Sequence, residues 1–194
     1  LAFPTHENLL NELRELYVSA EPLERSYLDL GRINLKSGVA LGFNPTDFFK
    51  TRAVVDPLSV DPVVLREGRL GTGMIRGQHL WQGGVITAAF APGLYDPTPV
   101  YSNTNLRSFD PSFDRTNAHD RFLLKGSVTL ADDFAPELVF YREGNRSFYG
   151  LNLTRNLGRS MVAYLEYAGG RRASLIDEAI RYGKKTGTLP EAAP

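Results

Sequence analysis

The chain has 194 residues, in which 22 Lys and Arg balance 22 Asp and Glu, and it contains no cysteine. This length fits a single domain, the balanced charge argues against a nucleic-acid partner held by bulk attraction to phosphate, and the lack of cysteine excludes disulfides, thiolate nucleophiles and thiolate zinc sites. The longest apolar run, residues 85–94, spans ten positions, whereas a membrane-spanning helix needs ~18–20. Helical membrane proteins are therefore excluded, but β-barrels are not, because their strands need only ~9–11 residues.

The N-terminal half predicts two β-hairpins. Residues 16–20 alternate between aliphatic and polar or aromatic side chains, which favours a strand over the amphipathic helix that residues 8–17 would also allow. A turn is predicted over residues 21–25 in the first hairpin and at Gln82–Gly84 in the second. The four predicted strands are residues 13–20, 26–35, 70–81 and 85–91.

The C-terminal half predicts four more strands. Residues 121–131 alternate strictly, with Leu124 on one face and Lys125 on the other, and this period of two is typical of a strand. Short turns at residues 143–146 and 156–159 separate the later strands. The four strands are residues 121–131, 137–143, 147–155 and 160–168. Together the eight strands predict an all-β protein with an antiparallel up-and-down meander.

Three connections in this meander are long. They are residues 38–69, 92–120 and 169–194, and a helix is predicted over 174–182. Loops of this length are uncommon in compact domains, and short turns at one end with long loops at the other are typical of outer-membrane β-barrels. We expect one β-barrel domain over residues 1–194, incomplete at both ends, because the sequence starts without Met and stops in a loop-like segment.

The alternating strands fit two environments. In an outer-membrane barrel the apolar face contacts lipid and the mixed face lines the lumen, whereas in a soluble β-sandwich the apolar face forms a protein core. Long strands and aromatic residues near the strand ends favour lipid. These aromatic residues are Tyr17, Tyr27, Trp81, Phe90, Tyr149 and Tyr167. The sandwich instead predicts a buried core that contains Ile86, Phe90, Leu151, Leu153 and Leu165.

Several short motifs carry a family resemblance. Residues 12–18 (Glu-Leu-Arg-Glu-Leu-Tyr-Val) and 27–32 (Tyr-Leu-Asp-Leu-Gly-Arg) resemble a hairpin of large Gram-negative outer-membrane barrels, namely the alginate-export type and a related family of uncharacterised outer-membrane proteins. Residues 44–47 (Asn-Pro-Thr-Asp) are similar to an element in an inward or periplasmic loop of those barrels. Residues 66–68 and 74–77 are also similar to the family.

The resemblance covers about residues 10–90. It implies a channel or export barrel in the outer membrane of a Gram-negative bacterium, without naming a substrate. The implied partners are outer-membrane lipid, a polar small-molecule or oligosaccharide solute, and the barrel-assembly machinery or further copies of the chain. The family has a longer chain and a terminal aromatic strand, and neither is found here.

We therefore expect passive conduction of a polar solute through a charge-lined lumen, and no enzyme activity. The alternative is a soluble periplasmic or surface β-sheet module that binds a glycan or a protein through its long loops. A third hypothesis, a barrel enzyme acting on lipid or peptide, would need Asp, His and Ser side chains to converge at one rim, with His119 as the only candidate centre.

Charged residues within the predicted strands indicate which side chains would line a lumen. A Lys or Arg on the lipid face at the bilayer midplane costs roughly 2–4 kcal/mol, so these side chains should point inward or lie at strand ends. The expected lumen-lining residues are Arg14, Arg32, Arg76, Lys125 and Glu166. Arg32 shares its alternation with Leu28 and Leu30, which predicts a β-bulge at Gly31.

A constriction is expected where the first long loop folds inward over residues 44–61. The polar residues of this constriction loop are Asn44, Asp47, Asp56 and Asp61. No histidine has a second histidine at metal-ligand spacing, and the acidic loop around Asp110, Asp114 and His119 lacks the spacing of an EF-hand. We therefore expect neither a metal nor a cofactor.

Overall fold

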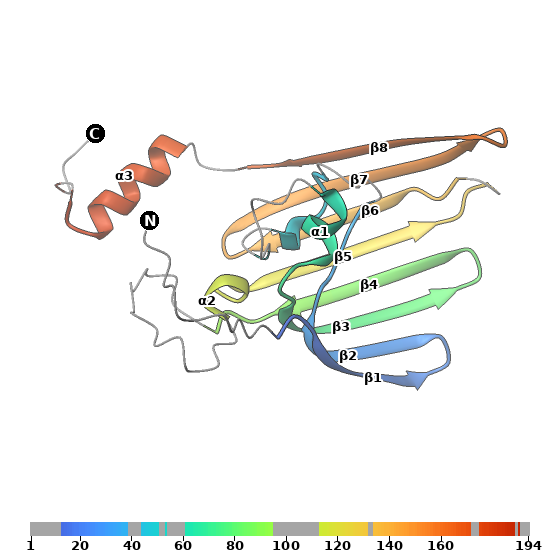
Figure 1. Ribbon diagram of the computed structural model, residues 1–194, viewed down its shortest axis with the longest axis horizontal. Helices are drawn as coiled ribbons and strands as arrows, with labels where there is room; N and C mark the ends of the chain where they lie inside the picture. The colour runs from blue at the N-terminus through green and yellow to red at the C-terminus, as the bar shows by residue number, and fades with distance from the viewer. Residues whose placement is uncertain are drawn as a thin grey trace.

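The computed structural model describes residues 13–38, 44–50, 53, 61–94, 113–131, 134–171, 175–188 and 190. Eight antiparallel strands form one sheet in chain order, so each strand pairs with the next along the sequence (Figure 1). This arrangement confirms the predicted all-β meander. The first and last strands are the two edges of the described sheet, which does not close on itself.

The strands lie close to their predicted ranges. They are β1 (Leu16–Leu23), β2 (Ser26–Ile33), β3 (Thr72–Trp81), β4 (Gly84–Ala91), β5 (Arg121–Val128), β6 (Glu137–Glu143), β7 (Arg146–Leu157) and β8 (Met161–Gly170). The helix considered for residues 8–17 is not formed over its described part, where β1 begins at Leu16. The predicted turn over residues 21–25 shrinks to Glu24–Arg25, because β1 continues to Leu23.

Four short helical segments accompany the sheet. They are η1 (Phe48–Lys50), α1 (Pro62–Glu67), α2 (Phe113–Thr116) and α3 (Leu175–Lys185). The helix predicted over residues 174–182 corresponds to α3, and the other three were not predicted. Within the described ranges, no helix has the length and apolar character needed to cross a membrane.

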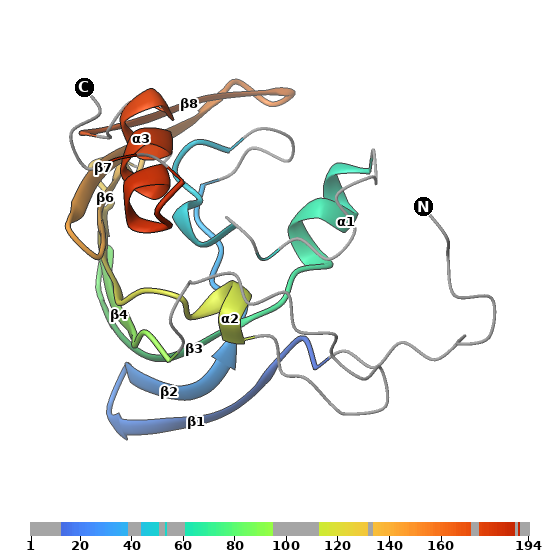
Figure 2. The ribbon, with the colours of Figure 1, turned by 90° about the vertical axis from the view of Figure 1, so that its left-hand side faces the viewer.

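The sheet curves into an open trough, which is clearest in the view of Figure 2. One end of the trough, the turn end, carries the links β1–β2, β3–β4, β5–β6 and β7–β8. The opposite end, the loop end, carries the long connections β2–β3 and β4–β5 and the chain that leaves β8 for α3, together with the short β6–β7 turn. The β2–β3 connection holds η1 and α1 and lies inside the trough (Figure 2).

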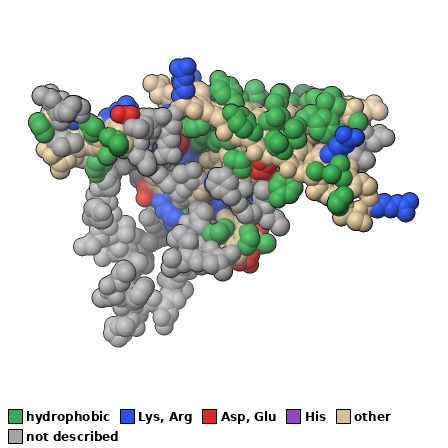
Figure 3. Space-filling view, turned by 90° about the horizontal axis from the view of Figure 1, so that it is seen from above, with side chains coloured by type: hydrophobic (Ala, Val, Ile, Leu, Met, Phe, Trp, Pro, Cys, Tyr) green, Lys and Arg blue, Asp and Glu red, His purple; other side chains and the backbone are tan. Residues whose placement is uncertain are grey.

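The two faces of the sheet differ in polarity. The convex face carries large apolar side chains that are exposed, among them Leu30, Ile75, Ile86, Phe90, Leu124, Leu138, Tyr149, Leu165 and Tyr167. Figure 3, which looks onto the β8 edge, shows hydrophobic side chains gathered along the strands. Ile86, Phe90 and Leu165 are 42%, 44% and 52% exposed, so the buried core that the sandwich alternative predicted is wrong for these three residues. Leu151 and Leu153 are half-buried.

The buried apolar core lies on the concave side instead. It joins strand residues of the concave face to the β2–β3 connection, and its members are Ile33, Leu35, Phe49, Met74, Ala89, Ala91, Leu123, Val139 and Tyr141. The sheet therefore packs on its own inward-folded connection, while its apolar outer face is left without a covering layer among the described residues.

The β-bulge predicted at Gly31 is wrong, because β2 pairs with β3 residue for residue from Ser26 to Ile33. Gly31 has a φ of 140°, and a Cβ atom there would lie 2.3 Å from the backbone oxygen of Leu16, so this position requires glycine. Two of the aromatic residues near strand ends that favoured lipid contact lie on the concave face instead of the convex face. Register places Tyr17 and Tyr27 with Ser19 and Asp29, on the concave side.

Candidate functional site

The described residues between β2 and β3, here called the inner segment, are 34–38, 44–50, 53 and 61–71. Thr46 of this segment contacts the concave face and is fully buried. A Cβ atom built on Gly150 of β7 would lie 3.1 Å from the Thr46 methyl carbon. Glycine at position 150 therefore lets the inner segment approach the strand closely.

Aromatic stacking is the second contact between the inner segment and the sheet. The ring of Phe48 stacks on Tyr141 of β6, with 4.8 Å between centroids and 4° between planes. Phe49 meets the same tyrosine edge-on at 5.6 Å, and Phe148 of β7 lies 5.8 Å from Phe48. Stacked and edge-on aromatic pairs are each worth ~0.5–1.5 kcal/mol beyond the area that they bury, so this cluster anchors η1 to the wall.

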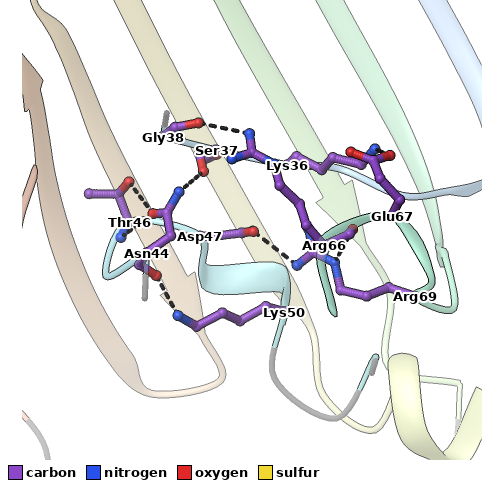
Figure 4. Close-up of polar contacts among 10 residues, drawn as sticks. All are labelled: Lys36, Ser37, Gly38, Asn44, Thr46, Asp47, Lys50, Arg66, Glu67 and Arg69. Atoms are coloured by element: carbon purple, nitrogen blue, oxygen red, sulfur yellow. Dashed lines mark hydrogen bonds and ion pairs between the residues drawn. The ribbon is translucent and has the colours of Figure 1, made fainter. Parts of the chain in front are cut away.

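Asn44 organises the turn that precedes η1, as Figure 4 shows. Its Nδ2 donates to the Ser37 carbonyl at 2.6 Å, and its Oδ1 accepts from the Thr46 backbone N–H and hydroxyl, each at 3.1 Å. The Lys50 ammonium donates to the Asn44 carbonyl. An asparagine that bonds the backbone two residues ahead is a common device for fixing a tight turn, and here the turn is buried.

A buried ion pair joins the two halves of the inner segment. Asp47 Oδ2 lies 2.9 Å from an Arg69 guanidinium nitrogen, and their side chains are 5% and 1% exposed. Arg69 Nε also donates to the Arg66 carbonyl, and Arg66 donates to the Gly38 carbonyl, at 2.8 Å and 2.9 Å (Figure 4). At the rim of this network, Lys36 pairs with Glu67.

Three charged side chains of the inner segment have pKa values shifted from their ordinary values. Burial raises the pKa of Asp47, and the nearby Arg69 guanidinium offsets only part of this effect. Burial also lowers the pKa of Lys50, with Asp47 acting against it. At the exposed rim, the hydrogen bond from Lys36 lowers the pKa of Glu67.

Charge pairs also span neighbouring strands on the concave face. Arg76 Nε of β3 lies 2.7 Å from Asp29 Oδ2 of β2. Two further pairs join β5 to β6, Lys125 with Glu137 at 3.2 Å and Arg121 with Glu143 at 3.1 Å. Asn152 of β7 donates to Glu137 at 2.8 Å. These contacts form a polar wall that faces the inner segment.

Three of the five predicted lumen-lining residues lie on the concave face of the sheet. These are Arg76, Lys125 and Glu166. Leu124 and Leu165, which adjoin Lys125 and Glu166 in the sequence, are exposed on the convex face. Arg14 precedes β1 and is exposed, and its carbonyl accepts from Gly71.

Arg32 is not on the concave face. It keeps the alternation of Leu28 and Leu30 along β2. It is nevertheless buried, since its guanidinium lies 5.3 Å from the centroid of Phe113 in α2 and its Nε donates to the Gly71 carbonyl. Its placement at the end of β2, beneath α2, replaces the inward orientation that was expected.

The predicted constriction residues differ in where the structure places them. Asn44 and Asp47 are buried in the inner segment. Asp61 is exposed, and its carboxylate accepts from the Val63 N–H at the start of α1 at 2.9 Å, so it acts as a helix cap. Asp56 lies outside the described residues.

Two of the most buried charged residues were not predicted. Arg121 follows the concave alternation of Leu123 and Lys125, and this signal would have identified it. Arg69 lies just before β3 and pairs with Asp47, twenty-two positions earlier by sequence number. No local pattern indicates that contact.

A pocket of about 710 Å³ opens at the loop end, and we call it the end pocket. It lies where the inner segment meets the ends of β6, β7 and β8 and the helix α3. Its lining residues are Pro45, Asp47, Phe48, Lys50, His119, Tyr141, Glu143, Gly144, Asn145, Arg146, Phe148, Ala168, Gly169, Gly170 and Arg181. This volume is in the range of small-molecule sites.

The acidic loop weighed as a calcium site is only partly described. Asp120 accepts from the Gly93 N–H at 2.7 Å, and its role is to hold the loop. Asp110 lies outside the described residues. Within the described ranges, no three His, Asp or Glu side chains are grouped as metal ligands.

Comparison with known proteins yields no relative. No protein-family model, curated protein sequence or solved structure matches the chain.

Proposed function

We propose that the eight strands form part of the wall of an outer-membrane β-barrel that conducts a polar solute through its lumen. The observation that carries this proposal is the polarity of the two faces: exposed Leu, Ile, Phe and Tyr side chains cover the convex face, and ion pairs line the concave face. Soluble monomers rarely expose apolar patches of more than a few hundred Å². Apolar outside and polar inside is the pattern of membrane barrels.

Such a barrel must close. Unpaired backbone groups at a sheet edge cannot be satisfied in hydrocarbon, so β1 and β8 would each pair with a further strand, from the same polypeptide or from another copy. Eight strands enclose an interior that side chains fill, and a conducting pore needs more strands. We place this barrel in the outer membrane of a Gram-negative bacterium.

The inner segment would then narrow the lumen. Its buried Asp47–Arg69 pair and its stacking on Tyr141 hold it against the β6–β7 part of the wall. The charge pairs of the concave face would set the potential along the remaining path. Passage would be passive.

The test uses two neighbouring positions of β8 with similar exposure. Leu165 is convex and 52% exposed, and Tyr164 is concave and 61% exposed. In lipid, Leu165→Arg should lower stability by roughly 2–4 kcal/mol, while Tyr164→Arg should change it by less than about 1 kcal/mol. Urea unfolding of the protein in phospholipid vesicles measures both values.

If both variants unfold at the same urea concentration, the convex face does not contact lipid. A monodisperse protein extracted into buffer without detergent would also contradict the proposal. Swelling of vesicles in solutions of neutral and charged sugars then tests conduction itself, because a barrel without a path would fold in lipid and leave the vesicles impermeable.

A further inference from the structure

The charged side chains that β2–β8 place on the concave face balance in number. The alternation along each strand and the register between strands identify these side chains, and all of these strands lie within the described residues. Four are basic and four are acidic, namely Arg76, Arg121, Lys125 and Arg146, and Asp29, Glu137, Glu143 and Glu166. This wall therefore carries no net charge.

Contacts between neighbouring strands pair most of these charges. Glu143 stands opposite both Arg121 and Arg146 in the register, and Glu166 attracts the Lys50 ammonium of the inner segment. The ion pairs across strands are Arg76 with Asp29 at 2.7 Å, Arg121 with Glu143 at 3.1 Å and Lys125 with Glu137 at 3.2 Å. In each pair, the attraction of one member for a passing ion is largely cancelled by the repulsion of the other. The wall therefore favours neither cations nor anions.

The paired side chains remain partly exposed on the concave side. Those of Arg76, Lys125 and Glu137 are 26%, 19% and 20% exposed. Uncharged polar groups lie between them, because Gln78 of β3 donates to the Thr87 hydroxyl of β4 at 3.3 Å. Guanidinium and ammonium groups have several N–H donors, and a carboxylate has several acceptor sites. Each pair therefore keeps hydrogen-bonding capacity for a polar solute.

Two tyrosine rings flank this band of polar side chains. Tyr27 stands opposite Gln78 in the β2–β3 register and is 38% exposed. Tyr164 lies two residues before Glu166 on the same face of β8 and is 61% exposed. Tyrosine combines a flat apolar ring with a hydroxyl group, so it suits a solute that has C–H groups on its faces and hydroxyl groups at its edge. Sugars have this chemistry.

We infer that the concave wall selects an uncharged, polyhydroxylated solute, of which a sugar is the simplest form, over ions of either sign. A hydroxyl group can donate to a carboxylate such as that of Glu137 and accept from an ammonium such as that of Lys125. A charged solute would lose hydration beside the wall and would meet no net counter-charge in return. The inference deepens the proposed function and rests on it, because selection among solutes requires conduction along this wall.

The unmodified protein gives the first test. In a planar bilayer with a KCl gradient, the ratio of K⁺ to Cl⁻ permeability should lie between about 0.5 and 2, because paired charges leave little net potential. In vesicle swelling, glucose should enter faster than anionic gluconate and cationic glucosamine. A ratio outside this range, or faster entry of either charged sugar, would overturn the inference and keep the channel. A protein that carries no current would reject both.

Two variants break one ion pair from opposite sides. Lys125→Met leaves the Glu137 carboxylate without its ammonium partner and should favour K⁺, whereas Glu137→Gln leaves the ammonium and should favour Cl⁻. The permeability ratio should shift by about two- to fourfold in each variant, which is the effect of one unit charge ~5 Å away in water. Shifts in the same direction, or no shift in either variant, would contradict the cancellation of charge on which the inference depends.

Arg142→Gln is the matched control for net charge, because Arg142 is exposed on the convex side of the same strand, β6. It should leave the permeability ratio unchanged, and a shift equal to that of Lys125→Met would show a general effect of net charge and reject the inference. The double variant Lys125→Met with Glu137→Gln should restore the ratio of the unmodified protein. A double variant that keeps the shift of either single variant would mean that the two charges do not cancel.

Discussion

The concave face of the sheet has a filled end and an open end. At the loop end, Tyr141 and Leu123 are buried beneath the inner segment, at 2% and 0% exposure. At the turn end, concave side chains of the same sheet are exposed, such as Val162 and Tyr164 of β8. Both regions have the same alternation of side chains, but the inner segment covers only the loop end, and β8 is an edge strand with a single neighbour.

This comparison shows where the stability of the fold resides. A sheet with one apolar face usually packs that face against a second layer, but here the described core is on the polar side, where the inner segment supplies Phe49 and Leu35. The strands at the loop end are therefore held by side-chain packing and buried ion pairs. At the turn end they are held mainly by their backbone hydrogen bonds.

The largest effect is expected from the buried ion pair at the filled end. Arg69→Met keeps the length of the side chain but leaves the Asp47 carboxylate buried without its partner. Removing one member of a buried pair costs about 3–5 kcal/mol. The free energy of unfolding in urea measures this loss.

Its control is an ion pair at the open end. Arg25 lies 3.7 Å from Glu24 in the β1–β2 turn, with both side chains well exposed, and such surface pairs contribute about 0–1 kcal/mol. Arg25→Met should therefore lower stability far less than Arg69→Met. Equal losses would show that the inner segment adds nothing to the filled end.

A smaller effect is expected from the titration of Asp47. Because burial raises its pKa above the ordinary value of 3.8, the folded state binds this proton more tightly than the unfolded state. The stability contributed by protonated Asp47 is thus present below pH 3.8 and is lost as the pH rises through the folded-state pKa.

Urea unfolding at a series of pH values tests the direction in which the free energy of unfolding changes with pH. Relative to Asp47→Asn, the unmodified protein should lose stability as the pH rises from 3.8 through that window. The opposite slope would mean that Arg69 outweighs burial and holds the pKa of Asp47 below its ordinary value.

Most of the sheet could be predicted from sequence because strand alternation is a local signal. Leu124 and Lys125 alternate within a single strand, and their faces follow from parity alone. Parity also places Arg32 correctly, on the convex side with Leu28 and Leu30. The inward orientation expected from its charge is wrong, because α2 covers the end of β2 and a contact with Phe113, from a distant segment, buries the side chain there.

The inner segment was predicted only in part for the same reason. The Asn-Pro-Thr-Asp sequence predicted, by resemblance, a loop that folds inward, and the structure buries Asn44 and Asp47 in the inner segment. Their partners follow no local rule. Arg69 meets Asp47 only because α1 returns the chain toward η1, and Gly150 receives Thr46 only because β7 lies beneath that turn.

The smallest effect is expected at the open end of the concave face. Tyr164→Thr preserves a high strand propensity and removes a ring that is 61% exposed, so stability should change by no more than about 0.5 kcal/mol. Urea unfolding under the conditions used for Arg69→Met gives the direct comparison. A loss above about 1 kcal/mol would mean that Tyr164 packs against another part of the protein, and the turn end would then be as filled as the loop end.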